Sequence, residues 1–385
     1  MRGRPMDRSY RRLMAIQVVL ALANASAAVF GFIFLLKRDG FAIGDLVVFS
    51  ILSFGVATLV CAVLVRTRSR RGDLLMSAGL AILASSYAAY VVASGWPLLV
   101  YVGVAWGLYI PLFFVPFNAL VIATTRTEDR AGKIGGFFLS FTAVAILAPI
   151  LGGTIIEAAG YPVVFSFAAI VLVADIALLA HLRIGREVVP IAFDFPRLGS
   201  RTATALFAEG GFEGLVFNVV PLLAYSFTQE ELSLGGLFSL FALAGGVVTV
   251  TLGVLSDRMK DRRPFLVLGA GATAASTALV VTATSLPAFA LANSLVSLTS
   301  AIAPVFLFTM AVERIPARPG HASVTREVLL NGGRTTSLVA YLALLAVGVG
   351  PFPAFALAAV CLAVVAVARP WKSPQDPEAA PRSED

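Results

Sequence analysis

Two carboxylates lie where the sequence is otherwise as apolar as a lipid tail. Glu209 and Glu213 belong to the stretch FAEGGFEGLVFN. Their spacing of four places both side chains on one face of a helix, and the glycines around them leave room for a neighbouring helix or for water. A carboxylate at the centre of a membrane helix costs about 2.5–3.5 kcal/mol. A carboxylate in this position is stabilised by a cation, by water in a cavity or by a bound proton. Reversible protonation is therefore the chemistry that these two residues could perform.

Arg334 is a candidate cation for one of them. It lies at about the same depth in its own apolar block as Glu209 does, counting about 1.5 Å per residue from the start of each block. We therefore expect a mostly structural Glu209–Arg334 pair, which leaves Glu213 near mid-membrane without a cation. Desolvation favours a neutral acid and water an ionised one, so we expect Glu213 to carry the proton. The alternative is a permanently protonated Glu213 that is hydrogen-bonded to a neighbouring helix.

The elements that hold these residues are long apolar blocks. The chain is 58% hydrophobic and 13% charged, whereas a soluble domain carries about 25% charged residues. Blocks of about 20 residues can cross roughly 30 Å of hydrocarbon as helices, while barrel strands would alternate over about 10 residues. The sequence predicts an all-α membrane protein with twelve transmembrane helices. The blocks are 13–36, 45–65, 74–95, 97–122, 133–156, 162–182, 203–227, 234–255, 265–284, 287–312, 328–349 and 352–368.

The placement of the positive charge supports an even number of spans. Of the 29 lysines and arginines, 27 fall at the two ends and in alternate connections, and only Lys37 and Arg38 fall on the other side. This asymmetry follows the positive-inside rule. It predicts an inner-membrane protein with both termini in the cytoplasm, and it argues against nucleic acid as a partner. We interpret the N-terminus as the first helix rather than as a cleaved signal peptide, because its apolar run continues to Leu36.

An internal repeat divides the chain into halves. Residues 41–64 and 232–255 share eight identical positions at an offset of 191 without a gap. This predicts two pseudo-symmetric six-helix bundles with the same orientation. We expect an N-terminal bundle at 1–182, a cytoplasmic linker at 183–202, a C-terminal bundle at 203–369 and a disordered cytoplasmic tail at 370–385.

Two motifs resemble a known family. The loop GVLSDRMKDRR (253–263) resembles the G-x-L-x-D-R signature of the major facilitator superfamily, and the block at 133–156 is similar to the G-P-x-x-G-G pattern of its drug antiporters. The resemblance covers 13–368, although Gly103 stands where such antiporters carry an arginine. It implies two six-helix bundles around a mid-membrane substrate site that opens alternately to each side. The matching residues are Gly253, Leu255, Asp257, Arg258 and Arg262 in the loop, and Gly135, Pro149, Gly152 and Gly153 in the block.

The same resemblance implies that helices 1, 4, 7 and 10 line the substrate site. Polar and aromatic residues gather on faces of three of these helices, where they could bind substrate. The alternative is interhelical hydrogen bonding, which Asn and Ser commonly provide in membranes. The candidates are Gln17 and Asn24 in helix 1, Trp106, Tyr109 and, on another side, Asn118 in helix 4, and Asn293, Ser297 and Ser300 in helix 10.

Charged loop residues could hold the cytoplasmic side shut. We expect Asp257, next to Arg258, to pair with Arg130 or Lys133 at the foot of helix 5. By pseudo-symmetry, Arg66 would pair with Glu327 before helix 11. The alternative is a set of positive loops without specific pairing.

The sequence therefore predicts a secondary active transporter. We expect proton-coupled efflux of a lipophilic neutral or cationic compound, because the apolar core holds acids and almost no cation. The alternative is proton-coupled uptake of a neutral metabolite such as a sugar. A membrane enzyme or a non-transporting receptor is a possibility from another class, but we find no H-E-x-x-H and no clustered His or Cys. We expect a monomer in the lipid bilayer whose partners are the small-molecule substrate and protons, with no cofactor and no metal.

Overall fold

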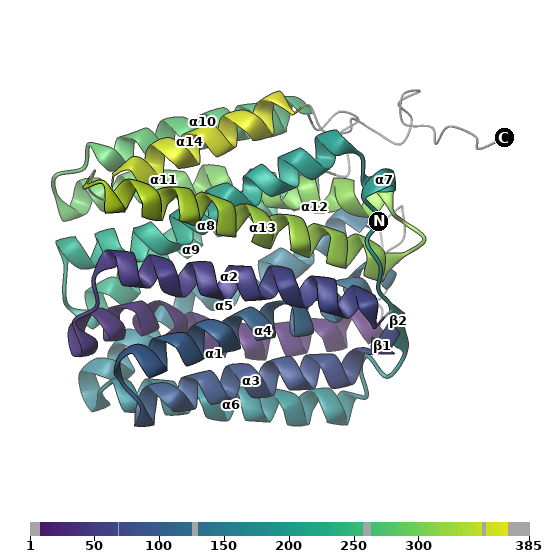
Figure 1. Cartoon of the computed structure of the whole chain (residues 1–385), viewed down its shortest axis with the longest axis horizontal. Coiled ribbons are helices and arrows are strands. Elements are labelled where there is room, and N and C mark those ends of the chain that lie inside the picture. The colour runs from purple at the N-terminus through teal and green to yellow at the C-terminus, as the bar shows by residue number, and fades with distance from the viewer. Residues whose placement is uncertain (1–7, 68, 125–129, 257–262, 349–351, 369–385) are drawn as a thin grey trace.

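The structure is a computed structural model that describes residues 8–67, 69–124, 130–256, 263–348 and 352–368. Long helices account for most of them, and they run side by side (Figure 1). The helices of the first half are α1 (Arg8–Asp39), α2 (Ile43–Arg66), α3 (Gly72–Val92), α4 (Gly95–Ala123), α5 (Arg130–Ala159) and α6 (Tyr161–Leu182). Those of the second half are α8 (Ser200–Phe227), α9 (Glu231–Ser256), α10 (Arg263–Val281), α11 (Leu286–Ser300), α12 (Ile302–Arg314), α13 (Pro319–Ala346) and α14 (Pro353–Val367).

The helices match the predicted blocks in number and order. Within the described ranges, eleven segments are long and apolar enough to cross a membrane when α11 and α12 are taken together, and α14 is a shorter apolar helix at the twelfth block. The tenth block is interrupted at Ala301 between α11 and α12. Pro304 explains this interruption, because it has no N–H to donate to the carbonyl of Ser300.

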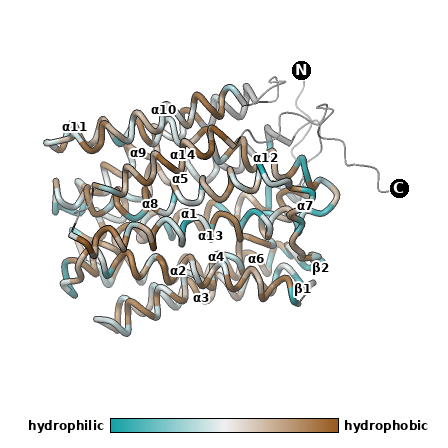
Figure 2. The backbone as a smooth tube through the Cα atoms, turned by 45° about the horizontal axis from the view of Figure 1, so that its top comes forward, coloured by the Kyte–Doolittle hydropathy of each residue, from teal (hydrophilic) through white to brown (hydrophobic). Residues whose placement is uncertain are grey.

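The outer surface of the helices is apolar. Large side chains such as Leu147, Val173, Leu268 and Val360 are well exposed there, and Figure 2 shows hydrophobic residues along the length of most helices. A helix satisfies its own backbone hydrogen bonds and can therefore present such a surface to lipid. Together with the helix lengths, this confirms the predicted all-α membrane fold.

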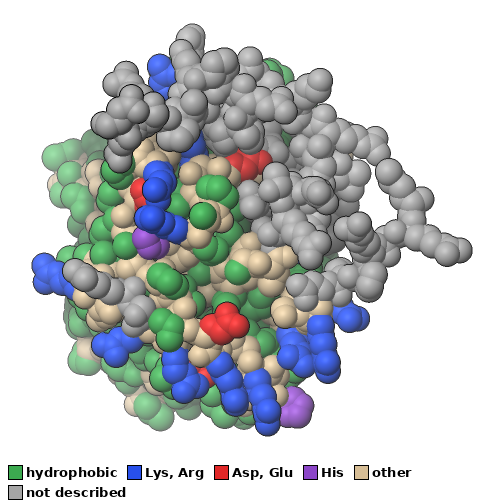
Figure 3. All heavy atoms as spheres, turned by 90° about the vertical axis from the view of Figure 1, so that its right-hand side faces the viewer, with side chains coloured by type: hydrophobic (Ala, Val, Ile, Leu, Met, Phe, Trp, Pro, Cys, Tyr) green, Lys and Arg blue, Asp and Glu red, His purple; other side chains and the backbone are tan. Residues whose placement is uncertain are grey.

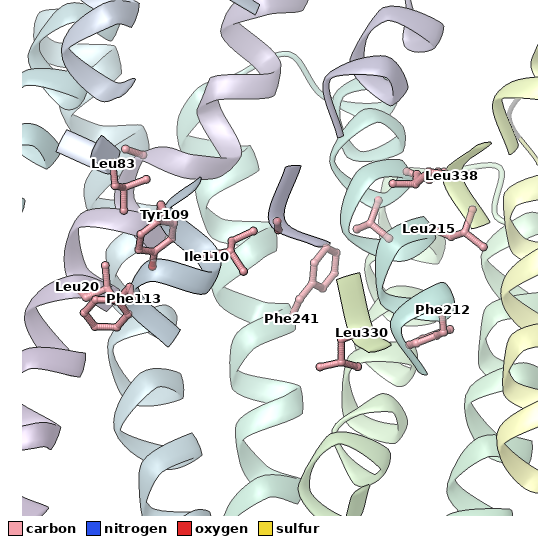
Figure 4. Close-up of a cluster of buried hydrophobic side chains, with 14 of the residues drawn as sticks. Leu20, Leu83, Tyr109, Ile110, Phe113, Phe212, Leu215, Phe241, Leu330 and Leu338 are labelled. Carbon is pink, nitrogen blue, oxygen red and sulfur yellow. The ribbon is translucent and has the colours of Figure 1, made fainter. Parts of the chain in front are cut away.

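One large apolar core runs through both halves. Figure 4 shows part of it, with Leu20, Tyr109 and Phe113 from the first half and Phe212 and Leu330 from the second. Helices α3 and α6 pack together at one edge of the molecule, and α10 and α14 pack together at the opposite edge (Figure 1). Between these edges, the halves meet mainly where α5 packs on α9 and α2 packs on α13.

The contact between α5 and α9 is made by backbone. A Cβ atom added at Gly153 of α5 would lie 2.6 Å from the carbonyl oxygen of Glu231. One added at Gly235 of α9 would overlap the carbonyl oxygen of Pro149. Gly153 of the helix 5 pattern and Gly235 of α9 thus allow the two halves to touch without intervening side chains.

A small sheet marks one end of the bundle. Strand β1 (Ser69–Arg71) pairs antiparallel with β2 (Val188–Pro190), and the short helix α7 (Phe195–Leu198) lies nearby (Figure 1). We call this end the β-end and the opposite one the far end. Figure 3 looks onto the β-end and shows Lys and Arg side chains along part of its rim. Most of the predicted linker is therefore ordered, whereas the domain boundaries themselves stay a prediction.

Candidate functional site between α8 and α13

Three glycines bring α8 and α13 into backbone contact. A Cβ atom added at Gly214 would lie 2.7 Å from the Cα atom of Arg334. One at Gly210 would overlap the backbone of Leu330, and one at Gly333 would overlap the carbonyl oxygen of Phe207. The glycines around Glu209 and Glu213 thus leave room for a neighbouring helix, and that helix is α13. This close packing sets the polar residues of both helices against each other.

Arg334 pairs with Glu213. Its Nη2 lies 2.5 Å from Glu213 Oε2, and the two side chains are only 13% and 12% exposed. The same guanidinium donates to Asn331 Oδ1 at 2.8 Å. It also lies 5.1 Å from the ring centroid of Phe54, which belongs to α2 in the other half. The pair therefore sits where the two halves meet.

The predicted Glu209–Arg334 pair is wrong, and so is the expectation that Glu213 lacks a cation. The physical reason is the start of α13. This helix begins at Pro319, nine residues before the apolar block at 328, so Arg334 lies about 14 Å deeper than predicted at about 1.5 Å per residue. Its Cα atom is level with Gly214, next to Glu213.

Glu209 has no hydrogen-bond partner among the described residues, although it is only 1% exposed. It lies within electrostatic reach of Glu213, Arg326 and Arg334. Burying an ionised carboxylate without a direct partner is costly. Glu209 is thus the one carboxylate of this cluster for which the structure provides no ion pair.

A second ion pair lies nearer the β-end of α13. Arg326 Nη1 lies 2.7 Å from Glu327 Oε1, and the guanidinium lies 4.7 Å from the ring centroid of Phe308 in α12. Asn118 of α4 donates to the same Glu327 oxygen at 3.4 Å, which links the two halves. We call the five residues Glu209, Glu213, Arg326, Glu327 and Arg334 the charge cluster.

The predicted Arg66–Glu327 pair is wrong. Arg66 is the last residue of α2 and is exposed, whereas Glu327 is buried and pairs with its neighbour Arg326. A buried carboxylate takes the cation that is buried beside it. This pair could not be expected from the sequence, because adjacent residues on a helix do not usually face each other.

The other predicted gate residues lie partly outside the described residues. This applies to Asp257 and Arg258 and to the side chain of Arg130. Lys133 donates to the carbonyl oxygen of Thr124 at 2.5 Å. The pairing of Asp257 stays a prediction.

The predicted substrate residues of helices 1 and 4 contact each other. Asn24 donates to the Tyr109 hydroxyl at 3.3 Å and accepts from the Tyr87 hydroxyl at 2.9 Å. Trp106 packs edge-on against both tyrosines. Gln17 is buried, and its Oε1 has no partner in the described part of the chain. Asn24, Tyr109 and Trp106 thus form a network inside the first half, the arrangement expected of interhelical hydrogen bonding.

The candidates of helix 10 lie in α11. Asn293 is buried, and its Oδ1 has no partner within the described ranges. Ser300, the last residue of α11, donates to the carbonyl oxygen of Ser297 at 3.5 Å. That carbonyl oxygen would lie 3.2 Å from a Cβ atom added at Gly245 of α9. Ser297 and Ser300 therefore lie at the break before α12. Among the described residues they make no hydrogen bond to the charge cluster.

The linker packs against both halves at the β-end. Val189 and Ile191 are buried in a small apolar cluster with residues of α2, α4 and α13. Residues on either side tie the linker to both halves, because Asp73 N–H donates to Gly185 at 2.7 Å and Asp194 N–H donates to Thr325 Oγ1 at 3.0 Å. Sequence analysis missed this contact. The other members of the cluster are Cys61, Leu64, Val115, Ala119 and Val324.

The far end is bridged as well. Lys37 Nζ lies 2.5 Å from Glu231 Oε1 and 2.7 Å from the carbonyl oxygen of Gln229. The Tyr161 hydroxyl donates to the same Glu231 oxygen at 2.9 Å. In mid-bundle, Ser50 of α2 donates to Asn218 of α8. The halves therefore touch on both sides of the charge cluster.

Comparisons with known proteins agree with this fold. The model of the Major Facilitator Superfamily matches residues 202–385. The uncharacterized MFS-type transporter C18.02 of Schizosaccharomyces pombe is 30% identical over 103 residues, which are 27% of this chain and 23% of that protein. The chain thus matches less than a quarter of that relative's length.

Solved structures match the whole length of the chain. The human organic anion transporter MFSD10 (TETRAN) has a TM-score of 0.68 at 15% identity and covers 95% of this chain and 100% of its own. The transporter FucP in the outward conformation has a TM-score of 0.66 at 12% identity, with 95% and 99% covered. A bacterial homologue of ferroportin in an outward-facing state has a TM-score of 0.68 at 15% identity, with 94% and 98% covered.

At these identities the solved structures establish the fold, and the family model adds the sequence relationship over the second half. The two halves described above and the matched structures thus share one fold. In its second half the chain matches the Major Facilitator Superfamily, and over nearly its whole length it has the fold of solved transporters, one of which belongs to that superfamily.

Proposed function

We propose that the chain is a secondary active transporter in which the charge cluster couples solute movement to protons. One observation supports this most. Glu213 has a cation and Glu209 has none, although both lie on one face of α8 against α13. A site with more carboxylates than cations in a dry interface holds a proton, and it can release that proton when the halves part and water enters.

The ion pair supplies a way to sense protonation. In this conformation Arg334 neutralises Glu213 and also contacts Phe54 in the other half. A proton on Glu213 would remove the charge that holds Arg334. The guanidinium could then move, and its contact with the first half would change with it. Proton binding would thus change a contact at the interface between the two halves, which must open during transport.

The charge of the cluster favours a neutral or cationic substrate. Three carboxylates stand against two guanidinium groups, and the two ion pairs leave Glu209 in excess. The sequence led us to expect almost no cation in the core, whereas the cluster holds two; it becomes negative when its proton is released. MFSD10 is described as an organic anion transporter, and an anion would be repelled here. We therefore propose proton-coupled efflux of a lipophilic neutral or cationic compound.

The orientation follows from the distribution of charge. Described arginines lie at the β-end in the connection after α2, in the linker and at the start of α8. By the positive-inside rule, this supports a β-end that faces the cytoplasm across an inner membrane. In this orientation the small apolar cluster around Val189 and Ile191 lies on the cytoplasmic side. The arginines in question include Arg66, Arg70, Arg71, Arg183, Arg186, Arg197 and Arg201.

Transport in proteoliposomes tests the proposal. The wild type should move substrate when only a pH gradient is applied, and Glu213→Gln should lose this activity while it retains substrate counterflow, which needs no net proton movement. Glu157→Gln, which alters an exposed carboxyl group of α5, is the matched control. If Glu213→Gln still concentrates substrate under a pH gradient alone, Glu213 is not the coupling residue.

A further inference from the structure

Four polar atoms of the charge cluster lack hydrogen-bond partners in the described part of the chain. Two are acceptors, the Oε1 and Oε2 atoms of Glu209. Two are donors, the Nε atoms of Arg326 and Arg334. Each arginine already holds another carboxylate through a terminal nitrogen, at 2.7 Å to Glu327 and 2.5 Å to Glu213. Unmet donors and acceptors in a buried interface are costly, and here they complement each other.

Glu209 stands between the two arginines along the helix pair. The helices α8 and α13 both begin at the β-end, and Gly210 faces Leu330 while Gly214 faces Arg334. Glu209 is therefore level with about residue 329. Arg326 and Arg334 are eight positions apart, about 12 Å along the axis, so one lies below Glu209 and the other above it. Both act electrostatically on Glu209.

We propose that Arg326 and Glu327 extend the proton-coupling site towards the β-end. In this extended site one proton is shared among Glu213, Glu209 and Glu327, while the two arginines pair with the two carboxylates that remain ionised. The inference rests on the proposed function, since it adds two residues to the same site. In the conformation described, the proton is on Glu209 and both outer pairs are formed.

The number of charges stays constant as the proton moves. When the proton passes from Glu209 to Glu327 through water, Glu209 becomes the anion and Arg326 turns its free Nε–H to it. Glu327, now neutral, no longer needs that cation. The same exchange with Glu213 would use Arg334. No step leaves a bare charge in the interface, which is the costly event in a buried cluster.

Two contacts connect the proton's position to the two halves. Glu327 accepts a hydrogen bond from Asn118 of α4, and Arg334 lies over Phe54 of α2. A proton on Glu327 removes the charge from the Asn118 bond and so weakens it, since hydrogen bonds to ionised groups are about twice as strong. A proton on Glu327 therefore loosens the interface near the β-end, and one on Glu213 loosens it further inside.

Direct titration of Glu209 tests the relay without any transport. The other titratable groups that face it are Glu213 on its own helix, Arg326 and Arg334 on α13 and Cys361 on α14. The infrared carbonyl band of protonated carboxyl groups in the purified protein should lose one component in Glu209→Gln. The midpoint pH of that component is the measured quantity.

The variants shift this midpoint in opposite directions. Glu327→Gln frees Arg326 for Glu209, so the band should disappear at a pH lower by about 1 unit or more. Arg326→Gln removes the cation, so the midpoint should rise by a similar amount. The charge-balanced double variant Arg326→Gln/Glu327→Gln should also raise it, and it keeps the test possible if a single variant fails to fold. Glu157→Gln is the control and should leave the midpoint unchanged.

The outcomes separate the two proposals. Midpoints that coincide with the wild type in Glu327→Gln and Arg326→Gln overturn the relay, even if a pH gradient drives transport. Shifted midpoints in a protein that no pH gradient drives support the shared proton and refute proton-coupled transport. Shifted midpoints together with transport that Glu327→Gln impairs, but Glu157→Gln does not, support both.

Discussion

Removal of Arg334 should destabilise the protein more than removal of any exposed arginine. Its side chain pairs with Glu213, donates to Asn331 and covers the ring of Phe54. Arg334→Ala therefore strands a carboxylate in the interface and removes the link to α2. Breaking a buried ion pair by removing one partner costs about 3–5 kcal/mol.

The lower end of this range is the better expectation. Both side chains of the pair keep a small exposed fraction, 13% and 12%, so some water reaches the stranded group. A loss of about 3 kcal/mol corresponds to roughly a hundred-fold change in the unfolding equilibrium constant, since about 1.4 kcal/mol is tenfold.

Reversible unfolding of the purified protein in mixed micelles measures this quantity. Arg201→Ala, which removes an exposed arginine from the first turn of α8, is the matched control and should change stability by less than about 0.5 kcal/mol. The charge-balanced variant Glu213→Gln/Arg334→Gln should be more stable than Arg334→Ala, since it leaves no unpaired charge. The reasoning is refuted if Arg334→Ala unfolds like the wild type, or if the double variant is the less stable of the two.

Three further predictions concern contacts around the cluster. Gly333→Ala should abolish the folded protein, because its Cβ atom would overlap the carbonyl oxygen of Phe207, whereas at Gly332 the nearest atom is 3.4 Å away on a side chain; size-exclusion profiles of Gly333→Ala and Gly332→Ala should differ accordingly, and equal profiles would contradict the α8–α13 packing. Thr325→Val should speed thiol labelling of buried Cys61 several-fold in a background without the other cysteine, because it removes the hydroxyl that accepts the Asp194 N–H at 3.0 Å and so loosens the hold of the linker on α13; an unchanged labelling rate would argue against the linker as a closure. Lys37→Gln should increase access from the far end by removing the 2.5 Å pair with α9, measured as labelling of a cysteine introduced near that end, and identical labelling would remove this pair from the closure.

The fold could be predicted almost completely because lipid imposes simple rules. Block length, charge asymmetry and the repeat at an offset of 191 each point to helices crossing a membrane in two halves. The linker strand could not be predicted. Its three residues Val188–Pro190 lie in a polar stretch, and their pairing with β1 is set by a contact more than a hundred positions away.

The sequence pointed to most residues of the charge cluster, but not to Arg326 and not to the pairing. Glu209, Glu213 and Arg334 are conspicuous because charges are rare in apolar blocks. Which of them pair depends on where α13 begins, and hydropathy placed that start too late because residues 319–327 are polar although helical. The Asn24 network was equally hidden, since its partner Tyr87 lies on α3, which is not among the helices that the resemblance places at the substrate site.

The close backbone contact between α5 and α9, which we call the backbone seam, limits how the two halves can rock against each other. Its tightest contacts, at Gly153 and Gly235, lie in the last turns of α5 and the first turns of α9, close to the far end. A pivot placed there has unequal lever arms. About 23 residues of α5 separate Gly153 from the β-end, roughly 35 Å at about 1.5 Å per residue. A rotation of about 10° about this pivot sweeps the β-end through roughly 6 Å over that length, while the few residues beyond Gly153 barely move. Rigid rocking on this seam can therefore open a wide mouth at the β-end, and a passage of similar width at the far end requires the helices there to bend.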